Sequence, residues 1–273
     1  MSIKKPKIVL LTGASGGIGT AIAELLMKKG YKIYGTTRNL DSAPKTSYLN
    51  LQLDVQDEDS IKKCVQEVLK EEGQIDILVN NAGYGLCGAI KDSSIEEVKN
   101  VFETNFFGAH RMIREVVPTM IKQGKGRIIN IGTFGGRLGL PFQGIYSASK
   151  AALAIYSDAL KIELLRDNIQ VSLIEPGDTR TDFNASRKYT DSYENDSDAQ
   201  RAVQIMYEAE QKGTKPKKVA KSVLRAIKAR RPKPRYTRGP DTKFFGILMR
   251  LLPYTIHSFV ARIYYDVPKK RDT

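Results

Sequence analysis

The stretch KIVLLTGASGGIGTAIAELLMKKG, residues 7–30, decides the fold class of this chain. Residues 7–12 form a short apolar run, which predicts a buried strand. Residues 17–30 carry apolar side chains at helical spacing and end at a glycine, which predicts a helix. A strand that passes through a glycine-rich turn directly into a helix is typical of the first half of a β-α-β unit.

The same alternation of strand and helix patterns continues along the chain. Further strands are expected at 32–38, 48–55, 75–83, 126–133, 169–177 and 234–238, and further helices at 60–73, 95–122, 145–167 and 216–230. Strands separated by helices of this length pair in parallel, so the sequence predicts an α/β fold with a doubly wound parallel sheet. Residues 184–215 are polar without a sustained period, and we expect a long functional loop there.

The positive charge of the chain is concentrated near its C-terminus. The formal net charge is +14, and residues 215–273 hold 17 Lys and Arg against three Asp and Glu. The rest of the chain holds 27 residues of each sign, so the whole excess lies in the last fifth. An electrostatic partner is therefore expected at that end. No nucleic-acid recognition module accompanies the charge, so a nucleic-acid partner is not expected.

The glycine-rich turn, TGASGGIG at 12–19, predicts a dinucleotide site. Gly13, Gly17 and Gly19 would let the backbone approach a pyrophosphate at the N-terminus of a helix. The second strand ends in Thr36-Thr37-Arg38, where an NAD site would carry an acid. A guanidinium suits a 2′-phosphate, so NADP is predicted over NAD.

A second stretch, GTFGGRLGLPFQGIYSASK at 132–150, predicts an acid/base group. Tyr146 and Lys150 are four residues apart and share one face of a helix. A phenol has a reference pKa of about 10. Because a nearby cation favours the phenolate, we expect Lys150 to lower the pKa of Tyr146.

Five motifs together resemble the short-chain dehydrogenase/reductase family. They are TGASGGIG, NNAG at 80–83, Asn105 within ETNFFGAH, YSASK at 146–150 and PGDTRT at 176–181, all in the family's order. The resemblance covers about residues 7–182. It implies a single Rossmann-fold catalytic domain over 1–238, with a C-terminal helical extension over 239–273.

The resemblance also implies a role for each matched residue. Tyr146 would exchange a proton with a carbonyl or alcohol while hydride passes to or from the nicotinamide, and Lys150 would bind the nicotinamide ribose. Asn105 would hold a water in the proton relay, unless it is only a polar kink in a long helix. Asp54 would accept from the adenine amine, unless it caps the next turn. The cofactor contacts implied are Gly13, Ser15, Gly17, Ile18, Gly19, Arg38, Asp54, Asn81, Gly83, Tyr146, Lys150, Pro176, Gly177 and Thr181.

The chain departs from the family pattern at one catalytic position. The family's serine lies 13 residues before the tyrosine, and here that position is Thr133. Threonine keeps the hydroxyl donor that steadies a developing oxyanion, while its methyl group narrows the site. We predict that Thr133 takes the place of the serine. The alternative is a β-branched residue at a strand end, which would leave Tyr146, Lys150 and Asn105 as the triad.

The extension over 239–273 is basic and amphipathic. It predicts two helical stretches, 240–253 and 254–265, with apolar faces formed by Phe244, Leu248, Leu251 and Leu252 and by Ile256, Phe259, Val260 and Ile263. Arg250, Pro253, His257 and Arg262 disfavour a transmembrane span. Two roles stay open: peripheral contact with a membrane surface, or cover for the substrate cleft or a subunit interface.

Such tails resemble those of hydroxysteroid and retinol dehydrogenases, which implies a lipophilic carbonyl or alcohol substrate, steroid-, retinoid- or lipid-like. The alternatives are an enzyme like the 3-oxoacyl carrier-protein reductases and a non-catalytic NADP-sensing regulator. The family implies a homodimer or homotetramer. The N-terminal apolar run reaches the glycine turn after about five residues, too short for an export signal, so a cytoplasmic location is expected. Cys64 and Cys87 lack metal-ligand spacing, and no metal is expected.

Overall fold

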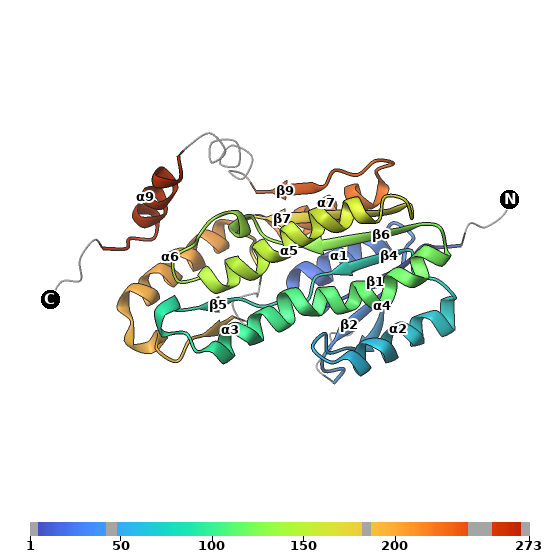
Figure 1. Ribbon diagram of the computed structural model, residues 1–273, viewed down its shortest axis with the longest axis horizontal. Coiled ribbons are helices and arrows are strands. Elements are labelled where there is room, and N and C mark those ends of the chain that lie inside the picture. Colours follow the sequence, from blue (N-terminus) through green and yellow to red (C-terminus); the bar gives the residue numbers. More distant parts are fainter. Residues whose placement is uncertain (1–4, 42–47, 182–186, 240–252, 269–273) are drawn as a thin grey trace.

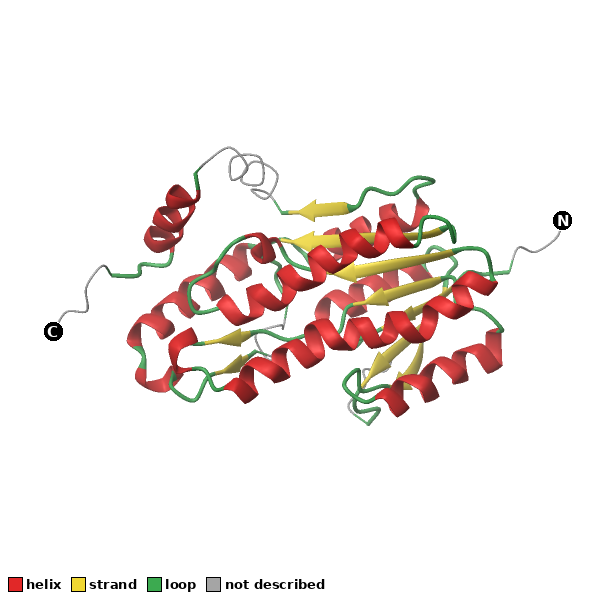
Figure 2. Cartoon of the chain, viewed as in Figure 1, coloured by secondary structure: helices red, strands yellow, loops and turns green. Residues whose placement is uncertain are grey.

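Seven parallel strands form one sheet at the centre of the molecule (Figures 1 and 2). The computed structural model describes residues 5–41, 48–181, 187–239 and 253–268. The sheet has the strand order β3-β2-β1-β4-β6-β7-β9. Its strands are β1 (Ile8–Leu11), β2 (Lys32–Thr37), β3 (Leu49–Gln52), β4 (Ile77–Asn80), β6 (Gly126–Ile131), β7 (Ile169–Pro176) and β9 (Arg235–Arg238). The predicted doubly wound α/β fold is confirmed.

Helices cover both faces of this sheet (Figure 1). Helices α2 (Glu58–Glu72), α4 (Gly108–Lys122) and α5 (Gly144–Glu163) bury side chains on one face, and α1 (Gly17–Met27) and α7 (Pro216–Lys228) on the other. Successive residues of β1 alternate between the two cores, with Ile8 and Leu10 in the first and Val9 and Leu11 in the second. Burial on both faces explains why this strand is a continuous apolar run.

The order of the strands reverses between β1 and β4. Strand β1 pairs with β2 on one side and with β4 on the other. In open α/β sheets, ligands bind outside the carboxyl ends of the strands at such a switch point. The glycine turn follows β1 at this edge, so the fold brings it to the place where a ligand is expected.

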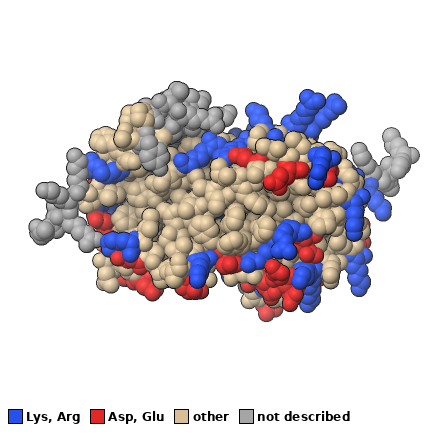
Figure 3. All heavy atoms as spheres, viewed as in Figure 1, with Lys and Arg blue, Asp and Glu red and all other residues tan. Residues whose placement is uncertain are grey.

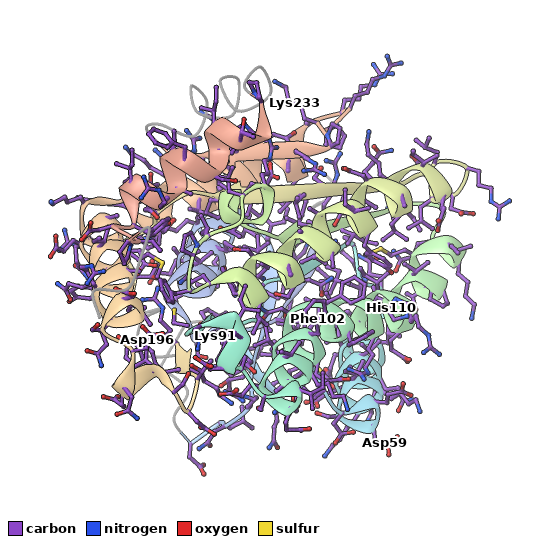
Figure 4. All side chains as sticks on the ribbon, turned by 60° about the vertical axis from the view of Figure 1, so that its left-hand side comes forward. Asp59, Lys91, Phe102, His110, Asp196 and Lys233 are labelled. Atoms are coloured by element: carbon purple, nitrogen blue, oxygen red, sulfur yellow. The ribbon has the colours of Figure 1, made fainter. Side chains whose placement is uncertain are left out.

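The long helix predicted over 95–122 contains a π-helical turn. It consists of α3 (Ile95–Phe102), the π segment η2 (Glu103–Phe107) and α4. The π segment lies between the labelled residues Phe102 and His110 in Figure 4. Within it, the N–H of Gly108 donates to the carbonyl of Glu103, five residues back. Such turns are often found at functional sites, and this one contains Asn105.

The sequence predicted a loop over 184–215. This prediction is wrong for the second half of that range, because those residues form helix α6 (Ser197–Lys212). Asp196, labelled in Figure 4, caps the helix by accepting from two backbone N–H groups. The buried face of α6 consists of Ala199, Ala202, Val203 and Met206. Two of these four side chains are alanines, which are only weakly hydrophobic. The helical spacing of apolar residues is therefore hard to recognise within this polar stretch. Before α6, β8 (Lys188–Tyr189) pairs with β5 (Leu86–Cys87).

The C-terminal extension is described only in part. Residues 240–252, which are all but the last residue of the first predicted amphipathic stretch, lie outside the described residues. The second stretch forms α9 (Tyr254–Tyr264), close to its predicted bounds. Tyr265 packs in one cluster with Cys87 and Met206, so the end of α9 joins β5 and α6. Among the residues that the structure describes, no helix is both long and apolar enough to cross a membrane.

Candidate active site

A cleft of about 1650 Å³ runs along the carboxyl ends of the strands and brings together most of the predicted site residues. Its lining includes Gly13, Ser15, Gly17, Ile18, Gly19, Arg38, Asp54, Asn81, Gly83, Thr133, Tyr146, Lys150, Pro176, Gly177 and Thr181. Asn105 is buried and does not line the cleft. The cleft continues beyond Tyr146 to α6 and α9, which the motifs did not predict. We call the part of the cleft beside the glycine turn the cofactor end and the part beside α6 and α9 the substrate end, after the roles that the sequence predicts for this site.

The cofactor end is built largely from backbone. Gly13 has φ of +65°, and a Cβ at Gly19 would lie 2.2 Å from the carbonyl oxygen of Gly13. The side-chain amide of Asn81 donates to the carbonyls of Thr12, at 3.1 Å, and Gly13, at 2.8 Å. Helix α1 begins at Gly17 without a side-chain cap, so its N-terminus faces the cleft through backbone. These features fit the pyrophosphate of a dinucleotide.

Two side chains near this end bear on the choice of dinucleotide. Arg38 follows β2, is exposed and lines the cleft together with Thr36 and Thr37. Asp54 also lines the cleft, and its Oδ1 accepts from the N–H of Gln56 at 3.0 Å. Asp54 therefore caps the turn before α2, as one of the two alternatives predicted, while its side chain still borders the cleft.

Thr133 and Tyr146 both line the cleft, and they are near enough for the Thr133 hydroxyl to act on the pKa of the Tyr146 phenol. The Thr133 hydroxyl also accepts from the N–H of Gly135 at 3.2 Å and lies 3.4 Å from the carbonyl oxygen of Pro176. Burial raises the pKa of Tyr146 above its ordinary value, and the Glu210 carboxylate raises it further. The Arg187 guanidinium and the Thr133 hydroxyl oppose this rise in pKa.

Lys150 is buried one helical turn after Tyr146 on α5. Its Nζ donates to the carbonyl of Ile131 at 3.0 Å, and burial lowers its pKa to about 8. The expectation that Lys150 lowers the pKa of Tyr146 is wrong for this structure, where Arg187 is the cation that does so. The physical reason is that the Lys150 ammonium points to the end of β6.

Asn105 lies behind the cleft wall, next to Lys150. A Cβ placed on Gly83 would lie 2.8 Å from the Asn105 Oδ1 and 3.2 Å from the Lys150 Nζ. The Asn105 amide donates to the carbonyl of Tyr84, at 3.0 Å, and to the hydroxyl of Ser149, at 3.1 Å. Asn105 therefore holds the segment after β4 against α5, and the π-helical turn directs its side chain there.

The turn after β7 forms one wall of the cleft. Pro176 ends β7, and the N–H of Gly177 donates to the carbonyl of Arg238 in the neighbouring strand at 2.8 Å. A Cβ placed on Gly17 would lie 3.0 Å from the Cβ of Thr181. Thr181 therefore packs against the start of α1, where it lines the cleft.

The substrate end contains two charged residues that the sequence analysis missed. The Arg187 Nη2 and the Glu210 Oε1 are 2.6 Å apart, and the Arg187 side chain is 1% exposed. Glu210 lies in the last turn of α6, so a correct prediction of that helix would have drawn attention to it. No local pattern identifies Arg187. Helix α9 completes this end with His257, Ser258, Val260, Ala261, Tyr264 and the adjoining Tyr265.

Over the described ranges, no group of three or more His, Cys, Asp and Glu side chains is placed to hold a metal ion. Cys64 and Cys87 are both buried and free.

Comparisons with known proteins agree on one family. A family model for short chain dehydrogenases matches residues 7–192. The chain is 35% identical over 268 residues to 3-ketodihydrosphingosine reductase of Bacteroides thetaiotaomicron, covering 96% of this chain and 99% of that protein. It is 38% identical over 191 residues to human retinol dehydrogenase 8, covering 65% and 60% of the two chains. The solved closed form of serine dehydrogenase complexed with NADP+ matches with a TM-score of 0.74 at 28% identity, over 86% and 95%.

Proposed function

This chain belongs to the short-chain dehydrogenase/reductase family, and from that premise we propose that it interconverts a carbonyl and an alcohol on a lipophilic substrate with NADP(H). The observation that carries the proposal is the placement of Thr133, Tyr146 and Lys150 together on the wall of one glycine-lined cleft, with Tyr146 and Lys150 one turn apart on α5. The family membership makes the chain an oxidoreductase. The cofactor, the substrate class and the residue roles are our proposal.

Each residue at the centre of the cleft has a chemical task in this proposal. The nicotinamide, when bound, supplies or accepts the hydride. Tyr146 gives its proton to the carbonyl oxygen during reduction, and its raised pKa keeps that proton in place at neutral pH. Thr133 donates to the same oxygen as negative charge develops. Lys150 binds the ribose. Asn105 holds the segment after β4 against α5 next to Lys150, and it binds a water in the proton relay.

Two observations support NADP over NAD. Arg38 stands where an acid would bind the ribose hydroxyls of NAD, and it lines the cofactor end. A guanidinium binds a phosphate through parallel hydrogen bonds. The serine dehydrogenase structure, similar to this chain at 28% identity, is complexed with NADP+.

Apolar walls at the substrate end support a lipophilic substrate. Leu138, Leu140, Val260 and Ala261 all line this part of the cleft. The names of the two relatives, a 3-ketodihydrosphingosine reductase and a retinol dehydrogenase, both denote lipophilic compounds. The alternative, a 3-oxoacyl carrier-protein reductase-like activity, would favour thioester substrates.

The test is consumption of NADPH by the full-length protein with long-chain ketones, fatty aldehydes, retinal, ketosteroids and 3-oxoacyl thioesters. We expect turnover with at least one of the ketones or aldehydes and little with the thioesters. Turnover confined to the thioesters would favour the alternative, a 3-oxoacyl carrier-protein reductase-like activity. No turnover with any compound, despite NADPH binding, would favour the non-catalytic regulator.

Helix α9 supports a second part of the proposal, peripheral contact with a membrane. His257 and Ala261 line the cleft, whereas Ile256, Phe259 and Ile263 are 38%, 55% and 59% exposed. In Figure 3, Lys and Arg side chains project from the edge that holds α7 and β9 in Figure 1. We propose that one face of α9 covers the cleft while the other lies on an anionic lipid surface.

Co-sedimentation with anionic and neutral vesicles tests this contact. We expect reversible binding of the full-length protein to anionic vesicles that weakens as salt rises, because salt screens charges beyond about 10 Å at 0.1 M. The double variant Phe259→Glu/Ile263→Glu should lose binding. Absence of binding by the unmodified protein at low salt would leave α9 as a cover for the cleft. The homodimer or homotetramer implied by the family stays a prediction.

A further inference from the structure

The ion pair of Arg187 and Glu210 brings buried charge to the substrate end of the cleft. Arg187 comes from the segment before β8, and Glu210 comes from the end of α6. The 2.6 Å contact joins the Arg187 Nη2 to the Glu210 Oε1. Burying two charges is costly even when they are paired, and such a pair is weak evidence for stability. Because stability does not explain the pair, we ask whether it binds a ligand in the cleft.

The position of Glu210 on its helix argues in the same direction. Glu210 lies in the last turn of α6, where the helix dipole is negative and disfavours a carboxylate. Arg187 offsets that repulsion. A glutamate here, rather than the lysine or arginine that the dipole favours, is not explained by the stability of the helix.

Exposure decides which member of the pair faces a ligand. The Arg187 side chain is 1% exposed, and the Glu210 side chain is 18% exposed. Both residues line the cleft, but the carboxylate presents the accessible surface. A carboxylate only accepts hydrogen bonds, and it can accept from several donors at once. The exposed member of the pair therefore favours a ligand group that donates, such as a protonated amine or a hydroxyl, and disfavours an anion.

Glu210 lines the same cleft as Tyr146 and Thr133, the proposed reaction centre. Its carboxylate and the Arg187 guanidinium both act electrostatically on the Tyr146 hydroxyl, in opposite directions. Cys87 and Thr133 are the other described groups that act on that hydroxyl. The charged residues Asp178, Lys188 and Lys212 line the cleft nearby but are exposed. Water screens those three, so the buried pair is the stronger source of charge selectivity.

We propose that Glu210, held in place by Arg187, binds an amino or hydroxyl group on the carbon next to the reacting carbonyl. This rests on the proposed function, and it narrows the substrate to an amphiphile: a ketone with a hydrogen-bond donor beside it and an apolar chain. The carbonyl meets Tyr146 and Thr133, the donor group meets Glu210, and the chain extends between the apolar side chains of α9 and Leu140. Arg187 is a positioning residue that fixes the carboxylate.

The test uses four long-chain ketones of equal length. One is unsubstituted, and the others carry an amino, a hydroxyl or a carboxylate group on the carbon next to the carbonyl. The full-length protein should have a higher kcat/KM for the amino or hydroxyl ketone than for the unsubstituted one, and the lowest for the carboxylate. Glu210→Gln should lower kcat/KM for the preferred ketone by about 10- to 100-fold, mainly through KM. Its effect on the unsubstituted ketone should be several times smaller.

Matched variants separate binding from folding. Glu208→Gln makes the same charge change on the same helix, at an exposed residue that bonds Gln204 and does not line the cleft. It should leave the order of the four ketones unchanged. Glu210→Asp keeps the charge but retracts it by one methylene, and should fall between the unmodified protein and Glu210→Gln. Glutamine can still accept from Arg187, so the thermal transition of Glu210→Gln should stay cooperative. If Glu210→Gln does not fold, the aspartate variant carries the test.

Two results would overturn the inference without touching the proposed function. One is reduction of the unsubstituted ketone as efficiently as the amino and hydroxyl ketones by the unmodified protein. The other is an equal loss on all four ketones in the Glu210 variants, through kcat rather than KM. Failure of the unmodified protein to reduce any ketone would instead contradict the proposed function itself.

Discussion

The two ends of the cleft are made in different ways. The cofactor end is shaped by backbone that follows β1 and β4 directly, with Gly13, Gly19 and the Asn81 amide in contact. The substrate end is assembled from side chains of the segment that leads into β8, of α6 and of α9, and α9 lies about 40 residues beyond α6 in the sequence. Because the two ends are built from different elements, a substitution at one end is expected to leave ligand affinity at the other end nearly unchanged.

Tyr146 stands between the two ends, so its substitution gives the largest effect. Tyr146→Phe removes the proton donor and should lower turnover by about 10²- to 10⁴-fold while NADPH affinity stays unchanged. Steady-state assays and NADPH fluorescence titration measure the two quantities. Tyr156→Phe is the control, because Tyr156 lies on the same helix and bonds His110 outside the cleft. Near-normal turnover of Tyr146→Phe would remove the tyrosine from the mechanism.

Thr133 is the next test, because it decides whether threonine replaces the family's serine. Thr133→Val keeps the shape of the side chain but loses the hydroxyl, and should lower kcat by about 10²-fold. Thr133→Ser keeps the hydroxyl and should stay active, with a wider site. Normal turnover of the valine variant, measured with the same ketone, would show that Tyr146, Lys150 and Asn105 act without a hydroxyl at this position.

The pH dependence of reduction tests the buried ammonium. The pKa of Lys150 is lowered to about 8 by burial, so its charge is present below that pH and lost above it. The raised pKa of Tyr146 keeps the phenol protonated over the same range. The ratio kcat/KM for reduction should therefore fall about tenfold per pH unit above an inflection near 8, which reports the free enzyme. Lys150→Arg should move the inflection beyond the measured range, and an unchanged profile would assign it to another group.

Arg38 gives the smallest expected effect, confined to the cofactor end. The unmodified protein should prefer NADPH to NADH by about tenfold in kcat/KM, or about 1.4 kcal/mol. Arg38→Ala should remove most of that preference, without changing KM for the ketone. The control is Arg166→Ala, since the Arg166 side chain is 89% exposed and outside the cleft. Equal use of both cofactors by the unmodified protein would contradict the NADP assignment.

The sequence predicted the fold, and it predicted which residues line the glycine-turn part of the cleft, because both signals are local. Burial of β1 on both faces needs a continuous apolar run, and the tight turn after it needs glycines at Gly13 and Gly19. The spacing of Tyr146 and Lys150 likewise follows from one helix. Each of these features can be recognised within a window of a few residues.

The substrate end could not be predicted, because its contacts depend on the tertiary fold. Arg187 and Glu210 meet only when α6 folds back beside the cleft, and the alanines on α6 give its buried face a weak period. The pKa of Tyr146 was misjudged for the same reason, since the cation that acts on it comes from Arg187 rather than Lys150. The π-helical turn at Asn105 also lacks a local sequence signal.

The most direct test of the account is product analysis with the unmodified protein, NADPH and a long-chain ketone. Mass spectrometry would count the alcohol formed, and absorbance would count the NADPH consumed. The account predicts one alcohol for each NADPH oxidised, and alcohol formation at least about 100-fold slower by Tyr146→Phe saturated with the same cofactor. Consumption of NADPH without alcohol, or equal alcohol formation by Tyr146→Phe, would contradict it.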